Sequence, residues 1–263
     1  MRPDDDLIAR ACDSIARYLA LGNETFEAHG ATFVRNRETP TRYDANHVGR
    51  VRTSNSAELE ALLRRMDVEY EGFGHRQMNL DPLTPPQVAA RLTLEPGYTA
   101  RDELFLILEG PLQAKSKSFE IREIVSGEDW RAYDVLDRSW WHESKFEHWN
   151  EDVMRYTHMQ KRLKARLGVT FWLAMTEGSA AGFFASWPGE NGVGQVEDLY
   201  VQPQYRHRGI ATALIAHCVD DARARGAGPV VIGADPEDTP KQMYAALGFK
   251  PAFLRRSYLR VLQ

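Results

Sequence analysis

The chain has 263 residues, of which 43% are hydrophobic and 27% are charged, and these values fit a globular protein of two ordinary domains. Its formal net charge of −4 argues against a general nucleic-acid-binding protein, because neutralising phosphates requires a concentrated basic face. No apolar run approaches the roughly 20 residues that a membrane-spanning helix needs, so we expect no membrane partner.

The start of the chain is acidic. Its sequence, Met-Arg-Pro-Asp-Asp-Asp, lacks the apolar core of a signal peptide. The two cysteines, Cys12 and Cys218, make neither a disulfide framework nor a metal-binding motif. We therefore expect a cytoplasmic protein that works without a metal.

The first half of the sequence alternates helical and strand patterns. Asn55 followed by Glu58 predicts the capped start of one helix, and another is predicted at 85–94. Strands are predicted at 31–35, 47–52, 74–80 and 102–108. A helix is also predicted over Asp5–Ala20, where apolar residues at intervals of four form one stripe: Leu7, Ala11, Ile15 and Leu19.

The stretch 110–118 is polar and lacks periodicity, as expected of a linker. We therefore divide the chain into an accessory α/β domain at 1–112, a linker at 113–118 and a second domain at 119–263. The second domain has predicted helices at 128–138, 150–167, 209–225 and from the pair Thr239-Pro240 to Gly248. Its predicted strands are 119–124, 169–175, 181–187, 195–201, 229–232 and 253–261, the last of which completes the domain. Both halves end in the same order of helix, turn and strand, which fits either a duplicated fold or two α/β domains that share this order by chance.

The segment between the strand at 195–201 and the helix at 209–225 is the most informative part of the sequence. Pro203 stops the strand, and the helix begins at Gly209, where the first backbone amides have no acceptor within the helix. The helix dipole places partial positive charge there, and Arg206 and Arg208 add full charges. Such a strand-to-helix turn is typical of a pyrophosphate site.

Two motifs here resemble the GCN5-related N-acetyltransferase (GNAT) superfamily. The segment 206–211, Arg-His-Arg-Gly-Ile-Ala, is similar to its Arg/Gln-x-x-Gly-x-Gly/Ala loop, and 244–249, Tyr-Ala-Ala-Leu-Gly-Phe, to its Tyr-x-x-Leu-Gly-Phe signature. The resemblance covers roughly 119–263 and implies the acyl-CoA N-acyltransferase fold, an α/β fold with a mixed central sheet and flanking helices. It implies acetyl-CoA as co-substrate, with the pantetheine arm on a strand edge and the pyrophosphate on the loop: Leu199, Tyr200, Val201, Arg206, His207, Arg208, Gly209, Ile210, Ala211 and Thr212.

The same resemblance implies catalytic residues. Glu-Asp-Leu-Tyr-Val, at 197–201, looks like a run of spermidine/spermine-type members in which the glutamate is the general base, so Glu197 is the candidate base. Asp198 is the alternative base, and strand alternation predicts that it lies on the opposite face of the sheet. The family places a tyrosine at the position of Tyr244 as general acid to the CoA sulfur. In another interpretation, Glu197 or Asp198 is only a strand-edge carboxylate in a salt bridge, and Tyr244 packs against the pantetheine.

The acceptor is expected over 128–152, because the family usually binds its acceptor over the region before the second strand. This segment is rich in acidic and aromatic residues, a combination that suits an ammonium group through charge and cation–π contacts. An amine acceptor is therefore the hypothesis. The alternative is a solvated helical face over an aromatic core.

The first half has no Arg-x-x-Gly-x-Gly/Ala loop, because its nearest equivalent, 51–55, lacks a glycine at the helix start. If it is a degenerate GNAT-like domain, the chain holds two tandem domains, and the first has lost CoA binding. The first domain could then wall the acceptor site or mediate pairing into a homodimer. Three functions stay open: an N-acetyltransferase, a non-catalytic acyl-CoA sensor, and a scaffold that keeps only the fold.

Overall fold

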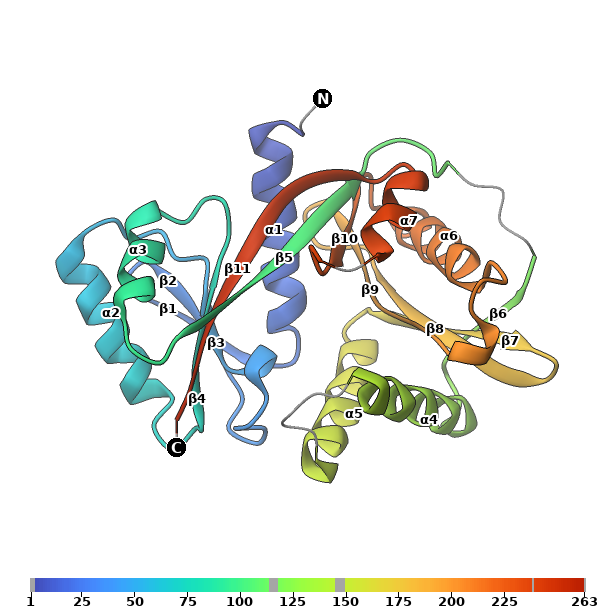
Figure 1. Ribbon diagram of the computed structural model, residues 1–263, viewed down its shortest axis with the longest axis horizontal. Helices are drawn as coiled ribbons and strands as arrows, with labels where there is room; N and C mark the ends of the chain where they lie inside the picture. The colour runs from blue at the N-terminus through green and yellow to red at the C-terminus, as the bar shows by residue number, and fades with distance from the viewer. Residues whose placement is uncertain (1–2, 114–117, 145–149, 238, 263) are drawn as a thin grey trace. The chain divides into compact units, whose positions relative to one another are not determined.

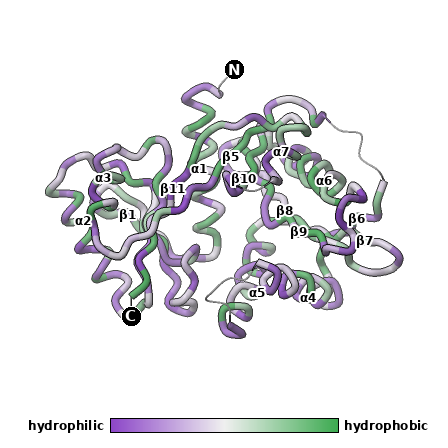
Figure 2. Tube along the Cα trace, viewed as in Figure 1, coloured by the Kyte–Doolittle hydropathy of each residue, from purple (hydrophilic) through white to green (hydrophobic). Residues whose placement is uncertain are grey.

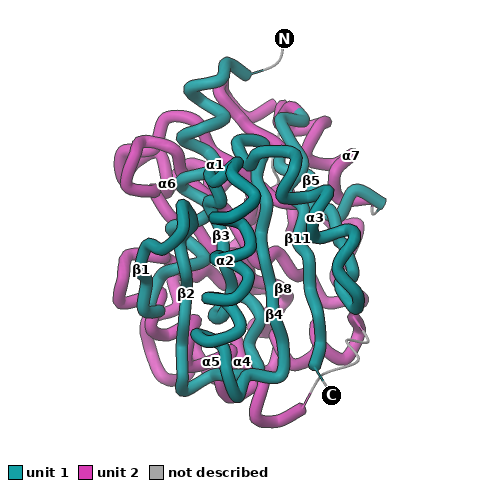
Figure 3. Tube along the Cα trace, turned by 90° about the vertical axis from the view of Figure 1, so that its left-hand side faces the viewer, with its two compact units in different colours: residues 1–105, 234–238, 251–263 teal, residues 106–233, 239–250 magenta. Residues whose placement is uncertain are grey.

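The computed structural model describes residues 3–113, 118–144, 150–237 and 239–262 (Figure 1). The chain forms two compact units, which Figure 3 shows in different colours. Unit 1 takes in residues 1–105, 234–238 and 251–263, and unit 2 takes in 106–233 and 239–250. The division at 113–118 stays a prediction, and residues 114–117 of that linker lie outside the described residues.

Unit 1 is a mixed sheet with helices. The strands run in the order β1 (Glu24–Ala28), β2 (Ala31–Arg35), β3 (His47–Gly49), β4 (His75–Leu80), β11 (Lys250–Val261) and β5 (Thr99–Leu108), and the last three residues of β5 belong to unit 2. Its helices are α1 (Asp5–Ala20), α2 (Ser56–Glu69) and α3 (Pro86–Leu94), with a 3₁₀ turn, η1, at Tyr43–Ala45. A core of fully buried side chains lies between the sheet and α2 and α3, and includes Phe33, Leu62, Met78 and Leu92.

The helix over Asp5–Ala20 and the capped start at Asn55 are confirmed. The sequence patterns missed β1, because that strand is mostly exposed and carries glutamates. The strand predicted at 47–52 ends earlier, at Gly49, since Arg50 takes a left-handed φ of 51°.

The C-terminal strand lies in a different unit from the one predicted. It was expected to complete the second domain, but β11 belongs to unit 1 apart from its first residue. There it pairs antiparallel with β4, from Arg256 opposite Leu80 to Val261 opposite His75. Local patterning cannot show which strand a sequence pairs with when the partners are far apart in the chain.

Unit 2 has a sheet in the order β10 (Val230–Ala234), β9 (Gly194–Val201), β8 (Ser179–Trp187), β7 (Thr170–Thr176) and β6 (Glu120–Glu123). Strands β9 and β10 are parallel, and the other pairs are antiparallel. The helices are α4 (Gly127–Ser144), α5 (Glu151–Arg166), α6 (Ile210–Ala224) and α7 (Pro240–Ala246), with a 3₁₀ turn, η2, at Pro203–Tyr205.

The helices of unit 2 cover both faces of its sheet (Figure 1). On one face, Tyr133 of α4 packs on Phe171 and Phe183, with ring centroids 5.7 and 4.6 Å apart. Helix α5 joins α4 on this face through the Arg162–Asp134 ion pair at 2.7 Å. On the other face, His217 of α6 lies 4.2 Å from the Trp172 ring. In Figure 2, hydrophobic and hydrophilic residues alternate along α4 and α5, as expected of helices with one face on a sheet.

Glycine and proline positions explain several boundaries. Glu177 and Gly178, with φ of 53° and 78°, make the predicted hairpin turn between β7 and β8. Gly226, with φ of 104°, follows the end of α6 as a C′ glycine. Thr239 occupies the N-cap position of α7 and Pro240 begins the helix, as predicted, although Thr239 has helical dihedral angles and its side chain makes no capping bond. Among the residues that the structure describes, no helix is both long and apolar enough to cross a bilayer.

Candidate functional site

The N-terminus of α6 presents unpaired backbone amides. Gly209 occupies the N-cap position with a left-handed φ of 95° and gives the helix no side-chain cap. The amide of Ala213 donates to the Gly209 carbonyl at 3.1 Å, so the amides of Ile210, Ala211 and Thr212 precede the first intrahelical bond. His207, also left-handed with φ of 61°, turns the chain just before this point. The result is a concave run of amides at the positive end of a helix, which is suited to an anion.

The two parallel strands of unit 2 stop pairing before they end. The register of β9 with β10 runs from Gly194 opposite Val230 to Val196 opposite Ile232. Strand β9 continues to Val201 and β10 to Ala234. In the described part of the chain, the edge of Leu199, Tyr200 and Val201 that faces β10 therefore lies beyond the paired region, directly before the α6 turn.

A β-bulge lies at the same place. Ala185 of β8 pairs with Glu197, but Phe183 pairs with Tyr200, so Asp198 and Leu199 together stand opposite Phe184 alone. Asp198 has a φ of 65°, which is uncommon for any residue but glycine, although aspartate tolerates it better than most.

The bulge corrects the prediction that Glu197 and Asp198 face opposite ways. Glu197 lies in the cross-strand row of Ala185 and Phe171, and Phe171 packs against α4. Asp198 forms an ion pair with Lys161 of α5, which lies on that same face. Alternation fails because the extra residue of a bulge shifts the strand by one position. Both carboxylates therefore face α4 and α5.

Two neighbours hold these carboxylates. The side-chain amide of Gln195 donates to Glu197, as expected for residues two apart on one strand face. The Lys161 ammonium lies against Asp198 and 6.0 Å from the Phe171 ring centroid. Sequence reasoning missed Lys161, because nothing in a helical pattern says which strand residue a lysine contacts.

Arg206 serves the loop in a way that the sequence did not predict. Its Nε donates to the Val201 carbonyl at 2.9 Å, and its guanidinium pairs with Glu143 of α4 at 2.7 Å. Tyr200 lies beside this pair, and burial, with the Glu143 carboxylate as a second cause, raises the pKa of Tyr200. The exposed Arg208 guanidinium lies over the Tyr205 ring, 5.4 Å from its centroid. Arg206 thus fastens the turn to the end of β9.

Comparison with known proteins points to one family. Residues 137–249 match the sequence model of the Acetyltransferase (GNAT) family. This part of the chain is a GNAT domain. No curated protein matches the sequence.

Solved structures extend the likeness over the whole chain. The GCN5-related N-acetyltransferase from Kribbella flavida is 15% identical with a TM-score of 0.73, covering 97% of this chain and 95% of that one. A functionally unknown conserved protein from Staphylococcus epidermidis is 12% identical with a TM-score of 0.71, covering 92% and 96%. A tandem GNAT protein from the clavulanic acid biosynthesis pathway is 12% identical with a TM-score of 0.61, covering 99% and 97%. These likenesses show the fold alone, and they confirm the predicted α/β fold class in both halves.

Tyr244 lies on α7 of the GNAT domain. Its side chain is buried, and its ring centroid lies 6.3 Å from that of Phe249 in the same motif. Its role as general acid stays a prediction. Cys218, on α6, is fully buried and burial raises the pKa of its thiol, so a covalent acyl-cysteine route has no support.

The acids of the segment 128–152 contact bases of the GNAT domain. Asp134 pairs with Arg162, and the buried Asp137 accepts from His158 at 3.1 Å. Asp129 accepts bonds from Ser126 at the start of α4, and these bonds lower the pKa of its carboxyl group. The aromatic residues Trp130 and Tyr133 pack on Phe171. These contacts favour the alternative of a helical face over an aromatic core, while residues 145–149 lie outside the described part.

The equivalent helix start in unit 1 differs. The Asn55 side chain accepts from the amides of Ala57 and Glu58, at 2.8 and 3.5 Å. These are the amides that would otherwise bind an anion, so the start of α2 does not offer the open amide run of α6.

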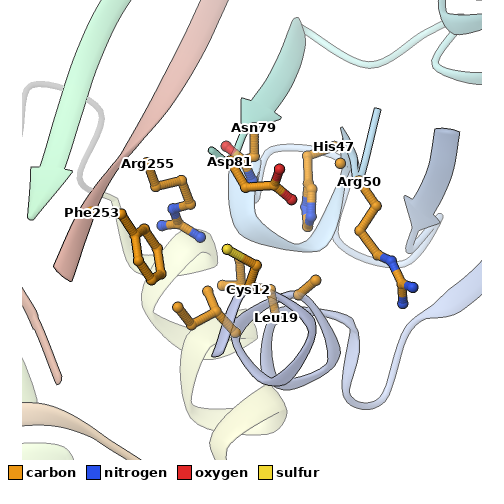
Figure 4. Close-up of a pocket in the computed structure, with 11 residues that line it drawn as sticks. Cys12, Leu19, His47, Arg50, Asn79, Asp81, Phe253 and Arg255 are labelled. Atoms are coloured by element: carbon orange, nitrogen blue, oxygen red, sulfur yellow. The ribbon is translucent and has the colours of Figure 1, made fainter. Parts of the chain in front are cut away.

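Unit 1 also has a small pocket between α1 and the sheet, with a cavity of about 30 Å³ (Figure 4). Cys12, His47, Asn79 and Arg255 point toward this space. The volume suits ordered water rather than a coenzyme. No group of His, Cys, Asp and Glu that could hold a metal occurs among the described residues.

Proposed function

We propose that the GNAT domain transfers an acetyl group from acetyl-CoA to a primary amine within a ternary complex. The observation that carries this proposal is that two features lie next to each other. One is the start of α6, whose amides have no side-chain cap, and the other is the end of β9, which lies beyond its pairing with β10. One feature suits a pyrophosphate, and the other suits an extended pantetheine arm that adds to the strand like a further strand. The family match supports acetyltransferase activity in general.

Glu197 is the proposed general base and Tyr244 the proposed general acid. Glu197, directly or through a water, removes a proton from the ammonium of the acceptor, and the amine nitrogen attacks the thioester carbonyl carbon. A backbone amide near Leu199 or Tyr200 stabilises the oxyanion of the tetrahedral intermediate. The carbon–sulfur bond then breaks, and Tyr244 gives its proton to the leaving thiolate. The nitrogen loses its second proton to solvent, Tyr244 regains a proton from solvent, and Glu197 releases to solvent the proton that it took.

Binding of CoA is the first test. We expect calorimetry to show binding of CoA by the full chain, and Gly209→Glu to abolish it, because a carboxylate would occupy the place of the phosphates. Gly110→Ala is the matched control, since its added methyl group would meet nothing within 4 Å. Absence of binding by the wild-type chain would refute the site.

Catalysis is the second test and separates the enzyme from the alternative, an acyl-CoA sensor. Thiol release from acetyl-CoA is measured with a panel of primary amines and with neutral and acidic acceptors. We expect release with amines and a loss of about 10²-fold or more in kcat for Glu197→Gln. CoA binding without release in any member of the panel would favour the sensor.

A further inference from the structure

Strand β9 carries a strained residue. Asp198 has a left-handed φ of 65° within an otherwise extended strand. For a residue with a side chain, this conformation costs roughly 1–2 kcal/mol. Such strain persists only where the surroundings hold it, so the contacts of Asp198 indicate what keeps the bulge in place.

The contact comes from α5. The Lys161 ammonium pairs with the Asp198 carboxylate, and the two side chains are only 14% and 24% exposed. A pair so far removed from water is screened less than a surface pair, and loss of one partner leaves the other charge poorly solvated. Lys161 therefore ties the extra residue of the bulge to the helix above it.

The Lys161–Asp198 ion pair also affects Glu197, the residue before Asp198. Glu197 precedes Asp198 directly and shares the cross-strand row of Ala185 and Phe171. The Lys161 ammonium lies 6.0 Å from the Phe171 ring centroid, beside that row. If the bulge relaxed into a regular strand, one of the two carboxylates would turn to the α6 face.

We propose that Lys161 is a positioning residue for acyl transfer, holding Asp198 in the bulge so that Glu197 faces the acceptor side as the base. The assignment rests on the function proposed above. Asp198 would have to leave the Lys161 ammonium to accept a proton from substrate, while Glu197 accepts a bond from the side-chain amide of Gln195. The pair thus selects Glu197 over Asp198.

The test compares variants of the full chain in the thiol-release assay, with an amine that the wild type acetylates. We expect Lys161→Met to lower kcat about tenfold and to move the acid limb of the kcat profile up by about 0.5–1 pH unit, since the charge of Asp198, no longer offset by the Lys161 ammonium, then repels a negative Glu197. Lys161→Arg should restore most of both values. Arg166→Met is the control, because it removes an exposed cation from the same helix.

If Lys161→Met fails to fold, a second comparison, between Asp198→Asn and Glu197→Gln, still tests the assignment. Asp198→Asn keeps the shape of the bulge residue and should lower kcat far less than Glu197→Gln. The reverse order, or a wild-type pH profile in Lys161→Met, overturns the assignment while leaving the transferase intact. Absence of thiol release from the wild type overturns the proposed function and the assignment together.

Discussion

Gly182 is a position where one methyl group should disturb the CoA site. It lies on β8 opposite Val201 of β9. A Cβ atom there would lie 2.5 Å from the Tyr200 carbonyl oxygen and 3.2 Å from the Val201 Cα. Both are backbone atoms, so no side-chain rotation can relieve the contact. Gly182→Ala must therefore move β8 and β9 apart.

The size of the effect follows from these distances. Ordinary contact begins near 3.4 Å, so the oxygen and the new methyl group must separate by about 0.9 Å. Overpacking of this kind costs roughly 1–3 kcal/mol of folding stability. The displaced segment is also the proposed pantetheine edge, and loss of one hydrogen bond worth about 1.4 kcal/mol would weaken CoA binding about tenfold.

Urea unfolding and calorimetric titration with CoA measure the two effects. Gly110→Ala, whose methyl group enters open space, should match the wild type in both. If Gly182→Ala kept wild-type stability and bound CoA within twofold of the wild type, the close approach of β8 and β9 would not shape the site.

Three further predictions concern other parts of the chain. Calorimetry should give about one CoA per chain, because Asn55 caps α2 in unit 1 while α6 is uncapped; two equal sites would contradict this. Tyr244→Phe should lower kcat with little change in CoA affinity, measured by thiol release and titration; a pure affinity loss would indicate a packing role. Burial lowers the pKa of His47 and of His75 from 6.5 to about 4, so the unfolded chain gains protons first and stability should fall as the pH drops from 6.5 to about 4. The loss is about 3 kcal/mol per histidine, measured by urea unfolding at several pH values. His47→Gln should flatten the dependence of stability on pH, whereas His142→Gln, which changes an exposed residue, should not. An equal slope of unfolding free energy against pH in the wild type and both variants would refute the burial argument.

Much of the fold could be predicted because its signals are local. The stripe on α1, the hairpin at Glu177-Gly178 and the glycine after α6 each depend on residues within a turn or two of one another. The turn into α6 was predicted for the same reason. Helix α4 was predicted to end near Arg138, yet it continues to Ser144.

The rest depended on non-local contacts. The bulge exists because Asp198 adopts a left-handed conformation next to Lys161, and period-two alternation assumes that no strand residue does so. An aspartate in the middle of the strand was the one available signal, since aspartate visits that conformation more readily than most residues. The Arg206–Glu143 pair and the close approach of β8 to β9 at Gly182 involve residues that are not neighbours in the sequence. No local sequence pattern predicts them.

The position of β11 has a consequence for synthesis of the protein. It lies between β4 and β5, and its Ser257 donates to Asn79, 178 positions earlier in the chain. During synthesis, the edge of β4 that pairs with β11 stays unpaired until β11 has been made, which is after residues 81–249. The second unit can therefore fold before the first is complete. A chain truncated near residue 250 would expose the unpaired edge of β4, which could pair with other chains and aggregate.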